Sequence, residues 1–332
     1  MAEIQDAKYE QLGLSKTVSQ VGGINAYHRN LDKISSTNPL LVLIHGYPQS
    51  AYEWRLMIPL LPAEIPLFCP DLPGYGQSKA MSEQHTKLDF GITILEALRS
   101  ILPGNQIVPL ILIGHDRGAR IAHRLQVSSS AGEPQLKELN LNIIGIALLD
   151  ILPTKLMWSL GSEAAVQVGS FHWAFLANVE LAMEMLQAYG GGKWAQKLIM
   201  RWAGSNEKRL DKLKSGDAMD VYGSFFDKKS VLRASCEDYK AGASLDVTAQ
   251  GEDQDNRRLI DAPVLLLYGK EYLGAKANVK VLDAWIDWVK DQSLITEIAI
   301  QDGVGHFVAE EAAEETAEAL LNWIETIQGK VA

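Results

Sequence analysis

Residues 108–120 read Val-Pro-Leu-Ile-Leu-Ile-Gly-His-Asp-Arg-Gly-Ala-Arg, and this stretch decides the fold. The apolar run at 108–113 is typical of a buried strand, and a helix-forming run follows the aspartate. Gly114 and Gly118 are the small residues that a sharp strand-to-helix elbow needs, because the elbow strains the backbone and brings helix and strand close together. We therefore expect the side chain of Asp116 to be held exposed on this elbow.

An aspartate at this position indicates nucleophilic substitution at a saturated carbon. A serine on such an elbow supports acyl transfer, but an alkyl group on serine would be an ether that water cannot remove. An alkyl group on Asp116 is an ester, which water can hydrolyse. The N-terminal end of the following helix favours the anionic carboxylate, so the first step needs no external base. The competing interpretation is that Asp116 merely caps this helix.

Two later segments supply partners in the order nucleophile, acid, histidine that this elbow uses. The apolar strand at 143–149 ends in Asp150, and His306 lies in a glycine-bracketed loop after the strand at 295–300. We assign His306 as the base that activates water for the second step. Asp150 is then expected to fix the tautomer of the imidazole and to stabilise its charged form.

Hydrolysis of the ester forms an oxyanion, for which two preorganised N–H donors are expected. The buried strand at 41–45 breaks into a glycine turn, and its position before the elbow predicts the Tyr47 N–H as one donor. The N–H of Arg117, directly after the nucleophile, is predicted to be the other donor.

Six motifs follow one another along the chain: His45-Gly-Tyr-Pro-Gln49, Asp71-Leu-Pro-Gly-Tyr-Gly-Gln-Ser78, Gly114-His-Asp-Arg-Gly-Ala-Arg120, Leu149-Asp-Ile-Leu-Pro-Thr154, Cys236-Glu-Asp-Tyr-Lys240 and Gly305-His-Phe-Val-Ala-Glu-Glu311. In order and spacing they resemble the motifs of α/β-hydrolases of the haloalkane dehalogenase and epoxide hydrolase branch. Within that branch, the chain is most similar to the haloacetate (fluoroacetate) dehalogenases. The resemblance extends from about Lys16 to Ile327.

Arg117 and Arg120 are three residues apart on the first turn of the elbow helix, so both are expected to face one pocket. Two guanidinium groups beside the nucleophile would bind a substrate carboxylate in bidentate fashion, which favours a haloacid over an epoxide. The resemblance implies the same clamp, whereas similar epoxide hydrolases usually have tryptophan where this chain has Arg117. The two arginines could instead form a solvated helix face or a structural ion-pair network.

The resemblance assigns the binding of the departing halide to a His-Trp pair and a tyrosine, which are His172, Trp173 and Tyr239 in this chain. Their side chains offer N–H and O–H donors to an atom on which charge appears only in the transition state. Packing in a helical core is the alternative role for these aromatic residues. Phe171 and Tyr47 differ from the tryptophan and phenylalanine typical of the family, which concerns substrate size and shape more than the reaction.

Strands and helical patterns alternate along the 332 residues, with apolar strands expected at 41–45, 66–70, 108–113, 143–149, 263–269 and 295–300. This alternation predicts an α/β class, and more closely an α/β-hydrolase fold with a mostly parallel central sheet flanked by helices. Residues 152–258 lack clear strands and are predicted to form an inserted helical cap between two parts of the core, 1–151 and 259–332. Such a cap would exclude water from the first step.

The formal net charge of −10 argues against nucleic acid or an anionic membrane as a partner and leaves a small-molecule substrate as the expected one. The absence of a signal segment, of a membrane-spanning run and of a disulfide framework favours a cytoplasmic location. We expect no metal and no cofactor, because no metal-ligand spacing or dinucleotide fingerprint occurs. A homodimer is suggested by the resemblance alone.

The leading hypothesis is a hydrolytic dehalogenase of small 2-haloacids. A soluble epoxide hydrolase with the same Asp-His-Asp groups is the alternative, in which Tyr239 would polarise the epoxide oxygen. A non-hydrolytic ligand-binding protein on the same scaffold is the alternative from another class, since fold alone does not fix function. Halide release, diol formation and tight binding without turnover would distinguish the three.

Overall fold

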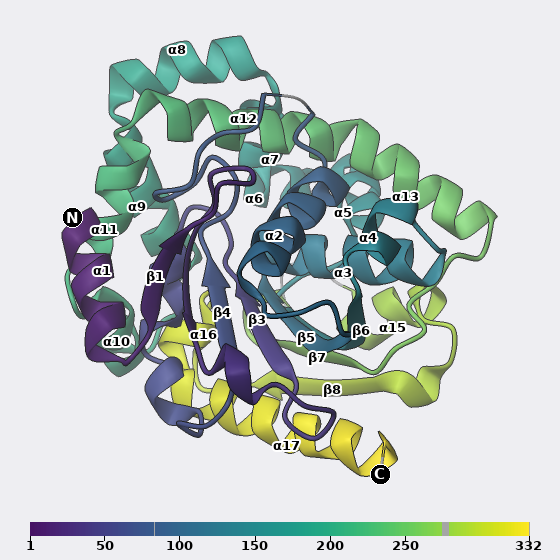
Figure 1. The fold of residues 1–332 in the computed structure, drawn as a ribbon. Helices are drawn as coiled ribbons and strands as arrows, with labels where there is room; N and C mark the ends of the chain where they lie inside the picture. The colour runs from purple at the N-terminus through teal and green to yellow at the C-terminus, as the bar shows by residue number, and fades with distance from the viewer. Residues whose placement is uncertain (83, 274–278, 332) are drawn as a thin grey trace.

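The computed structural model describes residues 1–82, 84–273 and 279–331 and has an eight-stranded sheet at its centre (Figure 1). The strand order across the sheet is β1-β2-β4-β3-β5-β6-β7-β8. The strands are β1 Ser15–Val18, β2 Asn25–Arg29, β3 Leu40–Ile44, β4 Leu67–Pro70, β5 Val108–His115, β6 Leu141–Leu149, β7 Val264–Gly269 and β8 Ile295–Ile300.

The sheet is mostly parallel, as the alternation of strands and helices predicts. Strands β3 to β8 pair in parallel, and β2 runs antiparallel to both of its neighbours, β1 and β4. The six predicted strands correspond to β3 to β8, with ends within two residues of the expected ones. β3, β5 and β7 read as continuous apolar runs because both faces of a parallel sheet are covered.

Helices cover the two faces of the sheet. α2 and α3 pack together beside β5 and β6, and α17 runs along the opposite side beneath β6, β7 and β8 (Figure 1). The helices outside the long insertion are α1 Ala2–Gln11, α2 Lys87–Ile101, α3 Arg117–Ser130, α4 Pro134–Glu138, α15 Val281–Trp285, α16 Val308–Glu311 and α17 Ala313–Val331. The chain therefore has the α/β-hydrolase architecture.

Between β6 and β7 the chain forms a long series of helices, which we call the inserted helices. They are α5 Thr154–Ser159, α6 Ala164–Gly169, α7 Phe171–Ala177, α8 Val179–Tyr189, α9 Gly191–Trp202, α10 Glu207–Lys214, α11 Ala218–Phe226, α12 Lys229–Ala243 and α13 Leu245–Asp255. In Figure 1, α7 in teal and α12 in green lie above the sheet. No strand occurs among the described residues of this segment, which agrees with the helical pattern of its sequence.

The register of the parallel strands brings the first two candidate residues together. His115 pairs with Leu149 at the ends of β5 and β6, so Asp116 and Asp150 follow at the same edge of the sheet. β3 ends beside β5, with Ile44 opposite Gly114. Because the carboxyl ends of parallel strands share one edge, loops far apart in sequence converge there.

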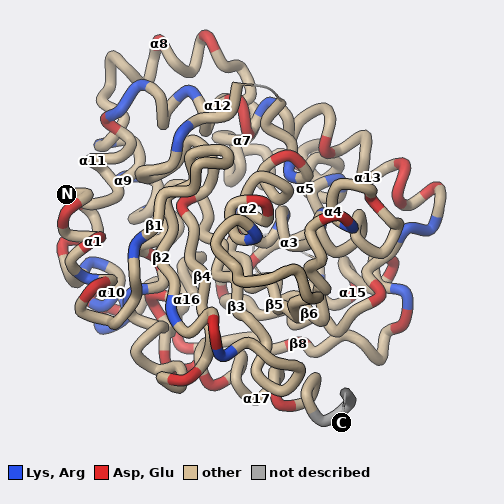
Figure 2. Tube along the Cα trace, in the orientation of Figure 1, with Lys and Arg blue, Asp and Glu red and all other residues tan. Residues whose placement is uncertain are grey.

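Charged side chains lie mostly on the outer elements (Figure 2). The strands β3, β5 and β6 contain no Lys, Arg, Asp or Glu, and the trace around them is almost wholly tan. Lys and Arg are interspersed with Asp and Glu along the helices in this view.

Candidate active site

Asp116 lies on a strained turn between β5 and α3. Its φ of 46° and ψ of −109° are outside the regions that residues with a side chain usually adopt. A Cβ at Gly118 would lie 2.0 Å from the carbonyl oxygen of Ile44, and a Cβ at Gly114 would lie 2.4 Å from the nitrogen of Ala119. The Asp116 side chain makes no capping hydrogen bond to α3, so it does not act as an ordinary helix cap.

His306 lies between two carboxylates. Its Nδ1 is 2.5 Å from Oδ2 of Asp150, and its Nε2 is 3.8 Å from Oδ2 of Asp116. An imidazole that donates from Nδ1 to a carboxylate keeps Nε2 as its basic atom. The second oxygen of Asp150 accepts the N–H of Gly269 at 3.1 Å, which orients the carboxylate. The structure thus brings together all three residues that the sequence motifs single out.

The Tyr47 N–H donates to Oδ1 of Asp116 at 3.1 Å. This N–H is therefore beside the oxygen that would carry negative charge when water attacks an Asp116 ester. The other predicted donor, the N–H of Arg117, makes no hydrogen bond to this carboxylate among the described residues. With Oδ1 bound by the Tyr47 amide, Oδ2 is the carboxylate oxygen near His306.

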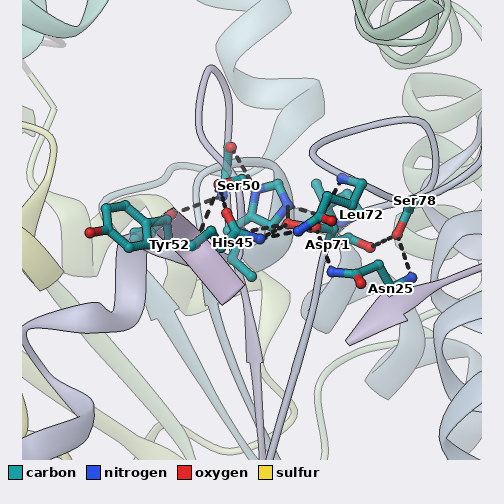
Figure 3. A network of polar contacts seen from close by, with 12 residues as sticks. Asn25, His45, Ser50, Tyr52, Asp71, Leu72 and Ser78 are labelled. Atoms are coloured by element: carbon teal, nitrogen blue, oxygen red, sulfur yellow. Dashed lines mark hydrogen bonds and ion pairs between the residues drawn. The ribbon is translucent and has the colours of Figure 1, made fainter. Parts of the chain in front are cut away.

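A buried polar network holds the turn that carries the Tyr47 N–H (Figure 3). Asp71 accepts the N–H of Ala51 at 2.8 Å, and Nε2 of His45 accepts the N–H of Leu72 at 2.9 Å. Burial lowers the pKa of His45, so the ring is neutral and Nδ1 donates to the carbonyl of the next residue at 2.9 Å. The loops after β3 and β4 are thereby joined to each other.

Opposing effects act on the carboxyl group of Asp116. Burial raises its pKa, but the positive charges of His306, Arg120 and Arg117 lower it, and the pKa is below its usual value. Asp116 is therefore an anion at neutral pH in a site that removes much of its hydration.

His115 and Glu53 form a fully buried ion pair beneath the elbow, with Nδ1 of the histidine 3.0 Å from Oε1 of the glutamate. Burial lowers the pKa of His115, but the charge of Glu53 outweighs this effect and raises the pKa to about 9. The charged imidazole can then donate from Nε2 to the carbonyl of His306 at 2.8 Å. The pair therefore supports the histidine loop from below.

We expect the free energy of unfolding to fall as the pH rises through about 9, because the folded pKa of His115 is above the usual histidine value of 6.5. The contribution is complete below pH 6.5 and is lost between 6.5 and about 9. Glu53→Gln keeps an acceptor for the Gly46 N–H but removes the charge, so it should flatten this dependence. Urea unfolding of both proteins across this pH range measures the effect. An unchanged pH dependence in Glu53→Gln would assign it to other groups.

Glu311 ties the His306 loop to the inserted helices. Its Oε2 accepts the N–H of Gly204 at 2.8 Å and of Gly305 at 2.9 Å, and its Oε1 accepts the N–H of Phe307 at 3.1 Å. The sequence interpretation quoted this residue in a motif but assigned it no role. Its position five residues after the histidine, behind a glycine-bracketed loop, was the available signal.

A cavity of about 390 Å³ lies over the elbow. Its wall includes Asp116, Asp150, His306, Arg120, His172 and Trp173. Two further aromatic residues on the wall, Trp202 and Tyr272, were not singled out from the sequence. Tyr272 follows the carboxyl end of β7, a position where ligand-binding residues of parallel sheets are common. The cavity is therefore built from loops of the core and from the inserted helices together.

The two arginines of the predicted clamp have different surroundings. Arg117 is directed to Asp238 of α12, with Nε 2.8 Å from Oδ2 and Nη2 2.7 Å from Oδ1, and it is not on the cavity wall. Arg120 is on the wall, and only its Nη1 is bonded, to the Leu152 carbonyl at 3.0 Å and to Thr154 Oγ1 at 2.9 Å. No other described residue accepts a hydrogen bond from its Nε or Nη2. The fork of Arg117 is engaged by a buried carboxylate, so of the two residues of the predicted clamp Arg120 alone presents unbonded donors to the cavity.

Asp238 joins α12 to the core. Besides Arg117, its buried carboxylate binds Lys87 Nζ and accepts the Tyr75 hydroxyl at 2.9 Å. Burial raises the pKa of Asp238, but the positive charges of Arg117 and Lys87 outweigh this effect and hold the pKa well below its usual range. The carboxylate that precedes Tyr239 therefore fixes the position of this tyrosine over the site.

Asp238→Asn should lower the free energy of unfolding by about 3–5 kcal/mol, because it leaves the buried Arg117 without its counter-charge and leaves Lys87 with Asp246 as its remaining carboxylate partner. Urea unfolding followed by tryptophan fluorescence measures this loss. The matched control is Glu237→Gln, one residue earlier, which loses only surface pairs with Arg233 and Lys240 and should change stability by less than about 1 kcal/mol. Equal effects of the two variants would contradict a special role for Asp238.

The three predicted halide contacts gather near the cavity. His172 and Trp173, from α7, lie on its wall, whereas Tyr239 is packed behind them, with ring centroids 5.7 and 6.1 Å from theirs. Tyr239 also packs edge-on against Tyr47, at 5.2 Å. Burial raises its pKa, so the hydroxyl keeps its proton. The Arg117 guanidinium lies 4.2 Å from the Tyr239 ring centroid.

Two further searches cover the part of the chain that the structure describes. Within residues 1–82, 84–273 and 279–331, no group of three or more His, Cys, Asp or Glu side chains is arranged to hold a metal ion. No helix in these ranges has the length and apolar character needed to cross a membrane.

A strained aspartate elbow, a histidine paired with an acid after the next strand and a backbone donor after β3 define an α/β-hydrolase site. Comparison with known proteins agrees with this class. A profile of the alpha/beta hydrolase family matches residues 41–319, and the chain belongs to this family. It is a hydrolase with dehalogenases and epoxide hydrolases among its relatives.

Individual relatives are distant but similar over nearly their full length. The chain is 23% identical over 293 residues to a fluoroacetate dehalogenase of Burkholderia sp, covering 88% of each protein. It is 24% identical over 310 residues to a soluble epoxide hydrolase of Corynebacterium sp. (strain C12), covering 90% of this chain and 94% of the relative. A structure described as an alpha/beta hydrolase from Nostoc sp PCC 7120 has a TM-score of 0.77 and 27% identity, covering 94% of this chain and 97% of that one.

Proposed function

We propose that this hydrolase releases halide from 2-haloacids through a covalent ester on Asp116. The observation that carries the proposal is the surroundings of one carboxylate. Oδ1 of Asp116 accepts the Tyr47 N–H, and Oδ2 is 3.8 Å from His306 Nε2. Arg120 lies on the same cavity wall and has guanidinium N–H donors that bond to no described residue. The similarity to a fluoroacetate dehalogenase supports the same chemistry.

In the first step, Oδ2 of Asp116 attacks the carbon that bears the halogen. A C–O bond forms as the C–halogen bond breaks, and the halide leaves with the bonding electrons. His172 and Trp173, on the same cavity wall, would donate to the departing halide. Arg120 would hold the substrate carboxylate, so that the reacting carbon meets the nucleophile in line.

In the second step, His306 Nε2 takes a proton from water, which attacks the carbonyl carbon of the ester. The negative charge develops on Oδ1, where the Tyr47 N–H is already 3.1 Å away. Asp150 stabilises the charged imidazole at Nδ1. Collapse of the intermediate returns the proton from His306 to the departing alkoxide, which leaves as the hydroxy acid. The proton that remains on the carboxyl group of Asp116 is released to solvent, and this regenerates the carboxylate.

The inserted helices would act as a cap in this reaction. They contribute His172, Trp173 and Trp202 to the cavity wall, and Asp238 joins them to the elbow helix through Arg117. A cap that limits water during the first step suits a carboxylate nucleophile, because hydration weakens such a nucleophile.

Epoxide hydrolysis is the second candidate. Tyr239 and His172 lie together above the elbow, with ring centroids 5.7 Å apart, and either could donate to the oxygen of an opening epoxide. The similarity to a soluble epoxide hydrolase supports this alternative. A single arginine in the cavity, instead of the expected two, also reduces the argument for an acid substrate.

The deciding experiment supplies purified protein with fluoroacetate, chloroacetate and 2-chloropropionate, and separately with terminal and aryl epoxides. The proposal expects stoichiometric halide and hydroxy acid from at least one haloacid. Diol formation without halide release from any haloacid would select epoxide hydrolysis, and binding without any turnover would select a non-hydrolytic role.

Arg120→Gln should lower kcat/KM for 2-haloacids by about 10- to 100-fold, because it removes a charged hydrogen-bond donor to the carboxylate. The corresponding 2-haloamides, which carry no charge, should lose less than about 3-fold. Steady-state halide release from each acid and its amide gives the two ratios. Equal losses on acid and amide would show that Arg120 does not bind the carboxylate.

A further inference from the structure

The cavity is too large for a two-carbon haloacid. Its volume is about 390 Å³, whereas the five non-hydrogen atoms of a haloacetate occupy roughly 150 Å³ even at the volume per atom of liquid water. About eight further non-hydrogen atoms would fill the remainder at the same density. Space of this size beside a reacting carboxylate is the kind that a longer substrate fills.

The polar groups of the cavity are gathered around the nucleophile. Asp116, His306, Asp150 and Arg120 come from the carboxyl edge of the sheet and from α3. The rest of the wall is largely apolar, with Leu152, Met157, Ala165, Val166, Val168 and Leu273 among its members. A ligand that matches this distribution has one charged end and one apolar end.

The apolar wall includes residues of two short helices, α5 and α6, which are the first two of the inserted helices. Val168 of α6 is 67% exposed, although it also lines the cavity. Ala165 is likewise exposed, and Val166 is half-buried. Apolar residues that line a cavity and also face solvent mark its rim, so an apolar group bound at the nucleophile could extend towards α6.

Resting on the proposed function, we propose that this site takes 2-haloacids that carry an alkyl or aryl substituent of about four to eight carbons on C2. The carboxylate binds at Arg120, the halogen-bearing carbon lies at Asp116, and the substituent occupies the space between Met157 and Val166. Among the residues that line the cavity, Arg120 is the one with a permanently cationic side chain, which suits a monocarboxylate with one apolar arm.

The first test needs no turnover. Isothermal titration calorimetry of the full chain with halogen-free carboxylates, from acetate through butyrate and hexanoate to octanoate, measures Kd against chain length. Each buried methylene should lower Kd by about 4-fold until the cavity is filled. A Kd that is constant or rises with chain length would overturn the substrate proposal, whether or not the protein releases halide.

The second test places a bulky group in the apolar part of the cavity. Val166→Trp should lower the ratio of kcat/KM for 2-bromohexanoate to that for chloroacetate by about 10-fold or more. The half-buried position of Val166 allows the larger side chain to be accommodated without a change of the core. The control is Leu181→Trp on α8, which is 56% exposed, lies off the cavity wall and should leave the ratio unchanged.

The two tests separate the substrate proposal from the proposed function. If halide release is fastest with chloroacetate and Kd is independent of chain length, the proposal of a long C2 substituent is overturned. The proposal of dehalogenase activity is kept. If longer carboxylates bind more tightly but no haloacid releases halide, the proposal of dehalogenase activity is overturned. The proposal that the site binds a carboxylate with an apolar substituent is kept. An unchanged ratio in Val166→Trp would place the substituent elsewhere than against α6.

Discussion

Asp116→Asn should reduce halide release from 2-haloacids by about 10⁴-fold or more, with little change in stability. The amide has nearly the same shape as the carboxylate and can still accept the Tyr47 N–H, so the elbow should persist. It lacks the negative charge with which Oδ2 attacks the substrate carbon, and no other carboxylate occupies this position on the wall. Halide-specific detection during steady-state turnover measures the loss.

The control for this variant is Asp32→Asn, an exposed aspartate far from the cavity, which should retain full activity. Circular dichroism and a urea unfolding curve show whether the fold is kept. Single-turnover hydrolysis in ¹⁸O-labelled water adds a direct readout, because the label should enter the Asp116 carboxylate of the wild-type protein. Substantial halide release by a folded Asp116→Asn protein, or label found only in the product, would exclude the covalent route.

His306→Gln should form the ester but fail to hydrolyse it. The first step needs only the anionic Asp116, whereas the second needs a base, and Nε2 of His306 is the basic atom near the nucleophile. We therefore expect one halide per protein chain in a rapid burst, followed by turnover about 10⁴-fold slower than in the wild type. Intact-protein mass spectrometry should detect the added alkyl group, and peptide mapping should place it on Asp116.

His85→Gln, which changes a histidine that does not line the cavity, is the matched control and should turn over normally. The burst also separates this effect from a general loss of structure, since a misfolded site would release no halide at all. Steady turnover by His306→Gln without ester accumulation would assign the base to another group.

Much of the fold could be predicted because its signals are local. The apolar runs that became β3 to β8 are continuous in sequence, and the elbow needs glycines on either side of Asp116. Two short strands, β1 and β2, were outside the six that were predicted. β1 has four residues with a mostly exposed pattern, so it lacks the apolar run that marks the central strands.

Parts of the candidate site depended on contacts that no local pattern encodes. The His115–Glu53 pair joins the last residue of β5 to the short 3-10 helix Ala51–Arg55, and Glu311 binds backbone groups of both the histidine loop and the inserted helices. Glu53 is far from His115 in sequence, and Glu311 is 107 residues from Gly204, although its partners Gly305 and Phe307 lie within six residues of it. Their common feature is burial, which a single sequence does not report for an isolated glutamate, since glutamate is usually exposed.

The sequence by itself determined the candidate nucleophile, its acid and its histidine, and with them the proposed chemistry of an ester that can be hydrolysed. These follow from the residue type on a strained elbow and from the order of strands whose carboxyl ends must share one edge. The tertiary structure alone decided that Arg117 and Arg120 have different surroundings. Arg117 meets a carboxylate that lies 121 residues further along the chain, and this buried pairing removes its fork from the cavity. The size of the cavity was likewise decided there, because volume depends on how far the inserted helices stand from the sheet, and no short-range pattern specifies that separation.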